Sequence, residues 1–321
     1  VAEAETGRVL EQHDGATGLP PASVTKAITA LYALDGLGPD YRFTTRLIAT
    51  GVLDKGVLKG DLILAGGGDP TLDTQALASL AAGMKKAGMH ALEGRFLVWG
   101  GAVPFKRAID EGQPEHVGYN PAISGLNLNY NRVHFEWKRA GGKWATSMEA
   151  RSDRHRPAVR FAKMSIAARD APVYSYASKG GRDEWSVAAQ ALGKGGSRWL
   201  PVRQPEIYAG EVLRELARAQ GVRLPEPQKG SSAGTVLVRQ QSAALSSLCR
   251  DFLLYSNNLM AEMIGLPYLD VVRAALFPAL ISYLALLYIV HMEALKLGIK
   301  AIPRSELPRF AQTVLRGCHF I

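Results

Sequence analysis

Ser23 and Lys26 are the residues whose types and spacing could most readily do chemistry in this chain. They stand three positions apart at the start of a segment with apolar residues at helical spacing, so they would share one face of a helix. A lysine amine at that separation can take the proton of the serine hydroxyl and make the serine a nucleophile. Alternatively, Ser23 caps the helix and Lys26 is a solvated first-turn residue. The pair alone leaves both interpretations open.

A second polar motif, with Ser256 and Asn258 flanking Asn257, follows far along the chain. The pattern S-x-N accompanies S-x-x-K in enzymes that form a serine acyl-enzyme. The alternative is a polar turn between two predicted helices, residues 246–254 and 259–264. The long separation between the two motifs makes a compact β-lactamase a poor match.

Longer segments around these motifs resemble one family. They are PPASVTK at residues 20–26, LILAGGGDPTL at 62–72, NLNYNRV at 127–133 and SLCRDFLLYSNN at 247–258. With them, residues 1–265 resemble the D-alanyl-D-alanine carboxypeptidase/endopeptidase family of DacB type, which are penicillin-binding proteins. This family places large inserted domains between its first two motifs, which accounts for the spacing.

The resemblance implies a role for each motif residue. Ser23 would attack the carbonyl of a D-Ala-D-Ala terminus or a D-amino cross-link of peptidoglycan, and Lys26 would take its proton. Ser256 would pass a proton to the leaving amine, and Asn258 would hold the substrate backbone. A water would then release the acyl-enzyme. β-Lactams are the expected ligands of the same site, and no cofactor is implied.

The resemblance also implies an α/β (α+β) fold, in which a penicillin-recognising domain like that of serine β-lactamases carries large, mostly-β insertions. We predict that residues 1–50 form the first part of this domain and residues 51–225 the inserted domains. Residues 226–265 return to the first domain, and residues 266–321 form a separate tail.

The third motif of the family, K-T-G, does not occur after Asn258. In the family its lysine draws in the substrate carboxylate, and its strand supplies a donor to the oxyanion hole. Lys296-Leu297-Gly298 has similar lettering but ends an apolar helical run, where glycine is a usual C-terminal residue. We therefore expect the closing strands to be missing and turnover to be weak or absent. The alternative is a penicillin-binding relative that is acylated but inactive.

The tail contains an uncharged run from Ala274 to Val290, which extends to Val271 past one arginine. About twenty helical residues span about 30 Å, enough to cross a bilayer. The basic residues after the run would face the cytoplasm, which leaves the enzyme-like part in the periplasm. A buried core helix is the alternative.

The tail also resembles part of the fused permease of TRAP-type transporters, at residues 267–275 (PYLDVVRAA) and 288–294 (YIVHMEA). This suggests two genes joined near Gly265. A chimeric, membrane-anchored fragment without turnover is thus a further hypothesis.

Composition is consistent with an exported enzyme. The 321 residues can bury a sizeable core, and the formal charge of +9 suits a polyanionic cell wall. Nucleic acid is not favoured, because the lysines and arginines are scattered without a binding motif. Two cysteines, Cys249 and Cys318, are too few for a disulfide scaffold. His116, His134 and His155 lack metal-ligand spacing, so no metal site is expected.

Local patterns predict the elements that would position these motifs. Helices are expected at residues 23–34, 77–87 and 205–219, with Gly221 as a stop signal. Strands at 45–51 and 57–64 should form a hairpin around Asp54-Lys55-Gly56, and 95–99 should be a further strand. Residues 133–186 are β-rich, with a turn at 140–143. The glycine-rich run 66–70 is expected to be a structural turn rather than a phosphate loop.

Overall fold

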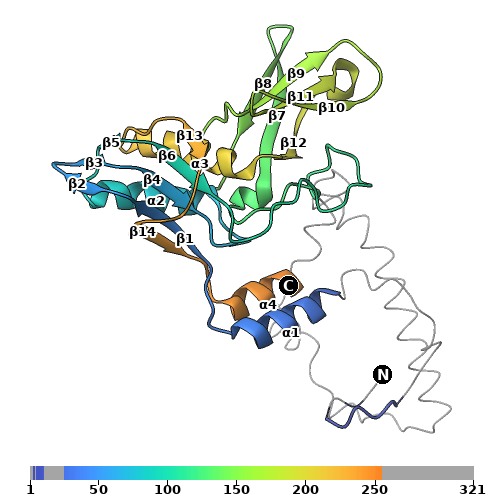
Figure 1. Ribbon diagram of the computed structural model, residues 1–321. Helices are drawn as coiled ribbons and strands as arrows, with labels where there is room; N and C mark the ends of the chain where they lie inside the picture. Colours follow the sequence, from blue (N-terminus) through green and yellow to red (C-terminus); the bar gives the residue numbers. More distant parts are fainter. Residues whose placement is uncertain (1–2, 4, 11–24, 255–321) are drawn as a thin grey trace, which may run out of the picture. The chain divides into compact units, whose positions relative to one another are not determined.

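The computed structural model describes residues 3, 5–10 and 25–254, and the remaining residues are drawn in grey in Figure 1. The chain divides into two units, Val1–Gly265 and Leu266–Ile321, and every described residue belongs to the first. The predicted helix at 259–264 and the permease-like tail lie outside the described residues.

A five-stranded sheet, in the order β13-β6-β4-β1-β14, holds the main core. β1 (Thr44–Ala49) pairs antiparallel with both β14 (Thr235–Gln241) and β4 (Leu62–Ala65). β6 (Phe96–Trp99) is parallel to β4 and to β13 (Pro227–Lys229). β4 and β6 are apolar on both faces, as expected for strands that are buried on both sides, and β1 is apolar from Leu47 to Ala49.

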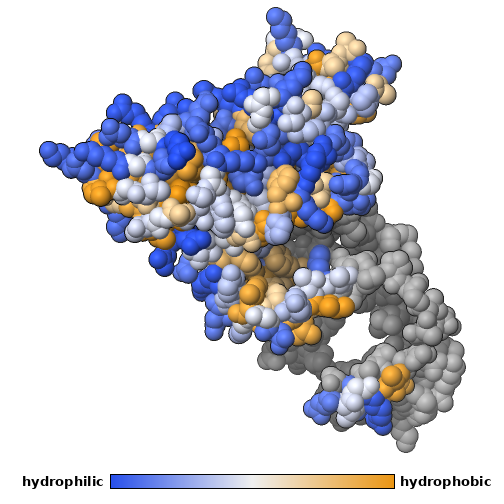
Figure 2. Space-filling model, viewed as in Figure 1, coloured by the Kyte–Doolittle hydropathy of each residue, from blue (hydrophilic) through white to orange (hydrophobic). Residues whose placement is uncertain are grey.

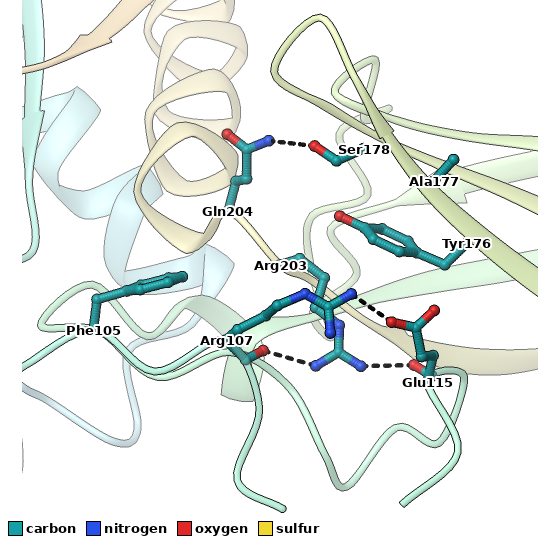
Figure 3. A pocket seen from close by; sticks show the side chains of 8 residues that line it. All are labelled: Phe105, Arg107, Glu115, Tyr176, Ala177, Ser178, Arg203 and Gln204. Atoms are coloured by element: carbon teal, nitrogen blue, oxygen red, sulfur yellow. Dashed lines mark hydrogen bonds and ion pairs between the residues drawn. The ribbon is translucent and has the colours of Figure 1, made fainter. Parts of the chain in front are cut away.

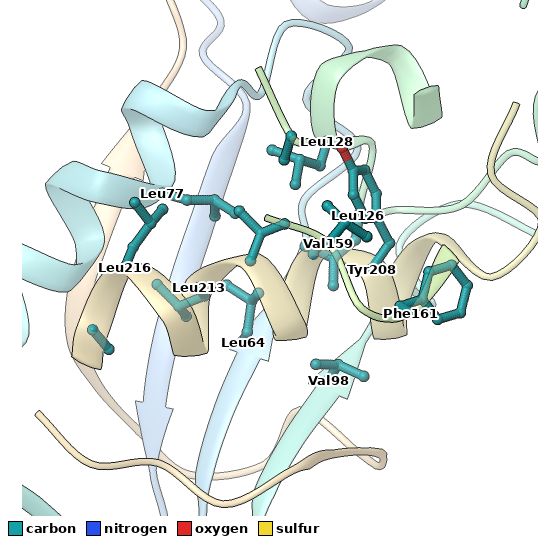
Figure 4. Packing of buried hydrophobic residues seen from close by; sticks show 14 of the residues in the cluster. Leu64, Leu77, Val98, Leu126, Leu128, Val159, Phe161, Tyr208, Leu213 and Leu216 are labelled. Atoms are coloured by element: carbon teal, nitrogen blue, oxygen red, sulfur yellow. The ribbon is translucent and has the colours of Figure 1, made fainter. Parts of the chain in front are cut away.

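Two helices, α2 (Thr74–Lys86) and α3 (Pro205–Ala219), pack on one face of this sheet and against each other. Figure 4 shows Leu213 and Leu216 of α3 directed toward Leu64 of β4 and Leu77 of α2. Leu64, Leu77 and Leu213 are fully buried. Asp73 caps α2, because its side chain accepts a hydrogen bond from the backbone N–H of Ala76 at 2.7 Å.

Two three-stranded sheets follow. One has the order β12-β7-β8 and is antiparallel, and the other has the order β10-β11-β9 with β9 parallel to β11. Their bounds are β7 Arg132–Ala140, β8 Lys143–Glu149, β9 Ala162–Ala167, β10 Tyr174–Lys179, β11 Arg182–Ala188 and β12 Gly195–Pro201. Short 3₁₀ segments, Leu128–Asn131 and Ala189–Leu192, precede β7 and β12. These strands pack on the same core, with Trp185 and Phe135 among the largest fully buried side chains.

The predicted hairpin around Asp54-Lys55-Gly56 is confirmed but interrupted. β2 (Val52–Asp54) and β3 (Val57–Lys59) join through Lys55 and Gly56, both with positive φ, as two-residue hairpins require. With β5 (Ala91–Glu93) they form a small separate sheet of order β2-β3-β5. The two long strands of the predicted hairpin are interrupted at Gly51 and Gly60. The chain segments approach closely there, and a Cβ on Gly51 would lie 1.7 Å from the carbonyl oxygen of Lys59.

The glycine-rich run after β4 is a tight structural turn, as expected. Gly66 donates its backbone N–H to the Trp99 carbonyl at 2.9 Å, and Gly68 donates to the Gly125 carbonyl at 2.9 Å. A Cβ on Gly66 would lie 2.2 Å from the Gly125 oxygen, so no larger residue fits without a shift.

Two further helices, α1 (Thr25–Leu37) and α4 (Leu245–Leu254), lie beside each other. They confirm the helices predicted at 23–34 and 246–254, within the described residues. None of the helices in the described part of the chain is long and apolar enough to span a membrane. The span predicted at Val271–Val290 lies outside that part.

Candidate active site

Lys26 lies in the first turn of α1, where the sequence placed it, and its side chain is half-buried. Ser23 precedes the first described residue of this helix by two positions and is outside the described residues. The N-terminal end of α1 is where the unpaired backbone N–H groups and the helix dipole favour developing negative charge.

α4 leads directly to the second motif. The helix ends at Leu254, and Ser256 and Asn258 follow it outside the described residues. Leu245, Leu248 and Cys249 are its buried residues, and Cys249 is a free thiol. Of the four predicted catalytic residues, the structure therefore describes Lys26 alone, and the roles of all four stay predictions.

A short junction fixes the start of α4 to the end of α1. Leu245 donates its N–H to the Tyr41 carbonyl at 2.8 Å, and Ser246 donates to the Pro39 carbonyl at 3.0 Å. These bonds satisfy two backbone donors that a helix start leaves unpaired. Because α4 begins where α1 ends and the helices pack together, they run antiparallel (Figure 1). The start of α1 and the end of α4 thus lie at the same end of the pair.

Polar contacts between Arg42, Phe43 and Ser242 complete this junction, which we call the neck. Phe43 donates its N–H to Ser242 Oγ at 3.0 Å, and Ser242 donates its N–H to the Phe43 carbonyl at 3.0 Å. Arg42 Nη1 donates to the Ser242 carbonyl at 2.8 Å. The chain leaves the helix pair at Phe43 and returns at Ser242, so all intervening residues form an insertion that begins and ends at one place.

Sequence reasoning missed the neck residues. Ser242 is 199 positions from Phe43, and neither residue belongs to a recognisable motif. Only the antiparallel pairing of β1 with β14 brings them together, from Thr44 opposite Gln241 onward. A pairing between strands so distant in sequence leaves no local signal.

The helix pair exposes much of its apolar surface. Among the described residues, Ile28, Leu31 and Tyr32 of α1 are 66%, 70% and 80% exposed, and no residue of α1 is buried. Figure 2 shows apolar residues on this helix pair beside the more polar surface of the insertion. The described residues thus supply only part of the packing that such helices normally have.

The fold is similar to that of penicillin-binding protein 4 (dacB) from Haemophilus influenzae. The TM-score is 0.62 at 20% identity, over 79% of this chain and 58% of that structure. A second structure of that protein, complexed with a β-lactam, gives a TM-score of 0.57 over 79% of this chain and 57% of the other. At this identity the likeness establishes the fold: the mixed α/β architecture of a penicillin-binding protein.

Sequence comparison places the chain more narrowly. Residues 1–271 match the sequence model of the D-Ala-D-Ala carboxypeptidase 3 (S13) family, and the chain belongs to that family. A D-alanyl-D-alanine carboxypeptidase of Actinomadura sp. (strain R39) is 33% identical over 130 residues, which are 40% of this chain and 24% of the relative. DacB of H. influenzae is 34% identical over 87 residues, which are 27% of this chain and 18% of the relative. The chain thus matches less than two thirds of each relative's length.

Proposed function

We propose that this protein is a serine-type D-Ala-D-Ala carboxypeptidase/endopeptidase of peptidoglycan that acts through an acyl-enzyme in the periplasm. The observation that carries the proposal is the antiparallel packing of α1 on α4, pinned at the neck. This packing brings the described start of α1, which follows Ser23 in the sequence, and the described end of α4, which precedes Ser256, to one end of the helix pair. Membership of the S13 family supports the same chemistry.

In the proposed reaction, Lys26 Nζ takes the proton of Ser23 Oγ, which attacks the carbonyl carbon of the penultimate D-Ala. The carbonyl π bond opens to an oxyanion at the amino end of α1, where the helix dipole is favourable. When the oxyanion collapses, the C–N bond breaks, and Ser256 relays a proton to the departing amine. A water then attacks the ester and regenerates Ser23, with Asn258 holding the substrate backbone throughout.

β-Lactams are proposed as ligands of the same serine, because a relative of the same fold has been solved with one. Acylation would open the lactam ring and leave the drug on Ser23 Oγ. Turnover of peptide is proposed to be slow for a chain in which residues 259–321 contain no K-T-G. One oxyanion-hole donor is worth on the order of 10²–10³ in rate. The same observation favours the second candidate, a penicillin-binding relative that is acylated without turnover.

The predicted division of the chain is retained as a proposal, with its boundaries moved to the neck. The penicillin-recognising part would then run to Arg42 and resume at Ser242, because β1 and β14 belong to one sheet of the insertion. Residues 266–321 remain a proposed permease-like tail that anchors the protein to a membrane. If so, Leu276→Lys with Leu284→Lys should abolish partition into membranes.

Labelling with a fluorescent penicillin, read by intact mass on the full chain, tests the proposed function. The expected result is one adduct of the mass of the intact drug, absent in Ser23→Ala and retained in Ser247→Ala. Ser247 is an exposed serine on α4 and is the matched control. An adduct that persists in Ser23→Ala, or no adduct on a folded chain, would reject the assignment of Ser23. Release of D-Ala from an acetylated D-Ala-D-Ala peptide then separates the two candidates.

A further inference from the structure

A cavity of about 480 Å³ lies within the insertion, where three segments meet (Figure 3). The segment after β6 contributes Arg107 and Glu115, and β10 contributes Tyr176 and Ser178. Arg203 and Gln204, just before α3, complete this polar lining. The volume lies in the range of small-molecule sites, and the lining combines charged groups with an aromatic ring.

Arg203 is held rigidly at the base of this cavity. Its side chain is 3% exposed, and its guanidinium donates to three backbone carbonyls. These acceptors are Arg107 at 2.9 Å, Asn120 at 2.7 Å and Glu115 at 2.8 Å. Its Nε is buried and has no hydrogen-bond partner among the described residues. These neutral carbonyl groups orient the guanidinium of Arg203 but do not neutralise its positive charge.

The guanidinium of Arg107 adds a second positive charge close to the first. It pairs with the Glu115 carboxylate and lies over the ring of Tyr176, with Cζ 5.6 Å from the ring centroid. Burial lowers the pKa of Arg203, and the positive charge of the nearby Arg107 lowers it further. The guanidiniums of Arg107 and Arg203 thus share one exposed carboxylate in the cavity lining, that of Glu115.

Asp183 forms no ion pair with the guanidinium of Arg203 in the described part of the chain. It is fully buried behind the cavity, and its two oxygens accept from Tyr176 Oη at 2.9 Å and from the Arg203 backbone N–H at 2.8 Å. Burial raises the pKa of this carboxyl, which disfavours its charged form. Within the described residues Arg203 forms no ion pair, and Glu115 and Asp183 favour its charged form only as neighbours. A buried cation is costly without a paired anion.

We propose that this cavity binds the carboxylate of a peptide, held by the guanidinium of Arg107 beside the buried positive charge of Arg203. The guanidinium of Arg107 can present two N–H donors that match the two oxygens of a carboxylate. The Nη groups of Arg203 already donate to backbone carbonyls, so Arg203 contributes its charge rather than a fork. Gln204 and Ser178, whose side chains lie 3.5 Å apart at the rim, offer a donor and an acceptor to a peptide group. Phe105, which is 52% exposed, provides an apolar wall for a short side chain. The choice of a peptide rests on the proposed function, since peptidoglycan stems carry free carboxylates.

The test uses the full chain and two probes: N-acetyl-D-Ala-D-Ala with a free carboxylate, and the same peptide as its C-terminal amide. Backbone amide signals of Ala177 and Ser178 in ¹H–¹⁵N spectra report on the cavity itself. The acid should shift them saturably, and the amide should bind about tenfold more weakly or worse, a loss of about 1.4 kcal/mol. Arg107→Gln should weaken binding of the acid by a similar factor.

Arg218→Gln is the matched control, because Arg218 also forms an exposed pair, with Glu215, at the far end of α3. It should leave the titration unchanged. Absent shifts, equal binding of acid and amide, or full affinity in Arg107→Gln would each overturn the proposal. Penicillin labelling of Arg107→Gln should equal that of the wild type. If penicillin does not label the chain but the acid still binds at the cavity, the proposed function is rejected and the proposed carboxylate site stands.

Discussion

The insertion and the helix pair that carries it differ sharply in how they are packed. The insertion buries Leu64, Phe96 and Tyr208 completely, in one continuous core shared by its sheets and by α2 and α3. The helix pair buries no residue of α1 and leaves Leu31 and Tyr32 largely in solvent. The insertion, which contains none of the proposed catalytic residues, is therefore packed more tightly than α1.

This difference in packing indicates that the stability of the insertion and the position of the helix pair depend on different interactions. A buried leucine contributes about 1.5–3 kcal/mol relative to an exposed one, so the insertion can hold its own structure. The helix pair is instead positioned by a few hydrogen bonds at the neck and by the buried residues Leu245, Leu248 and Cys249 of α4. We therefore expect that the stability of the insertion and the placement of the helix pair can be changed independently.

Matched leucine substitutions should show the largest contrast. Leu64→Ala, at a fully buried position of β4, should lower the free energy of unfolding by about 2–5 kcal/mol, because it removes packed atoms and leaves a cavity. Leu31→Ala, at a position 70% exposed on α1, should change it by less than about 0.5 kcal/mol. Urea unfolding of the full chain measures both. Equal losses would show that α1 belongs to the same cooperative core.

Ser242→Ala should have a smaller and more local effect. It removes the acceptor of the partly buried Phe43 N–H, and the loss of such a hydrogen bond costs about 0.5–1.5 kcal/mol. Native-state hydrogen exchange should show faster exchange at Phe43 and Leu245, with Leu64 unchanged. Ser247→Ala, the exposed control on α4, should leave all three amides as they were. Equal acceleration at Leu64 would mean that the neck and the insertion open as one unit.

Elements with strong local signals could be predicted from the sequence. α3 has the predicted bounds, Pro205–Ala219, because proline at the first helical position and apolar residues at helical spacing agree. Gly221 follows it with φ +81°, as a stop signal should. The turn at 140–143 is likewise present, with positive φ at Gly141 and Gly142.

Features that depend on distant partners could not be predicted. The parallel pairing of β4 with β6, the neck and the peptide-carboxylate cavity each join segments far apart in sequence. A left-handed turn at Asn129, Tyr130 and Asn131 was also missed, although asparagine tolerates positive φ better than most residues. Its alternating asparagines were the available signal. Asn129 holds this turn to α2, donating to Thr74 Oγ1 at 2.9 Å and accepting from the Thr74 N–H at 3.2 Å.

The smallest predicted effect is a pH dependence that belongs to the insertion. His134 on β7 is 5% exposed and lies edge-on to Trp199, with ring centroids 5.1 Å apart. Burial and then Arg151 lower the pKa of His134 below its usual 6.5, although Glu136 and Glu149 partly oppose this. The unfolded chain therefore takes up the proton first as pH falls. Stability is complete above the unfolded pKa and is lost as the pH drops through 6.5 toward the folded pKa.

His134→Gln should flatten this dependence, since it removes the group whose proton uptake differs between the two states. The free energy of unfolding of both proteins, measured from about pH 8 to about pH 5, gives the two slopes. Above about pH 7 the slopes should agree, which serves as the internal control; below it the wild type should fall more steeply. His116, stacked on Tyr174, also has a pKa lowered by burial and by Arg198, so a residual slope is expected in the variant. An unchanged slope would mean that acid destabilises the chain through groups other than His134, and would remove the insertion's buried histidine from the account of its stability.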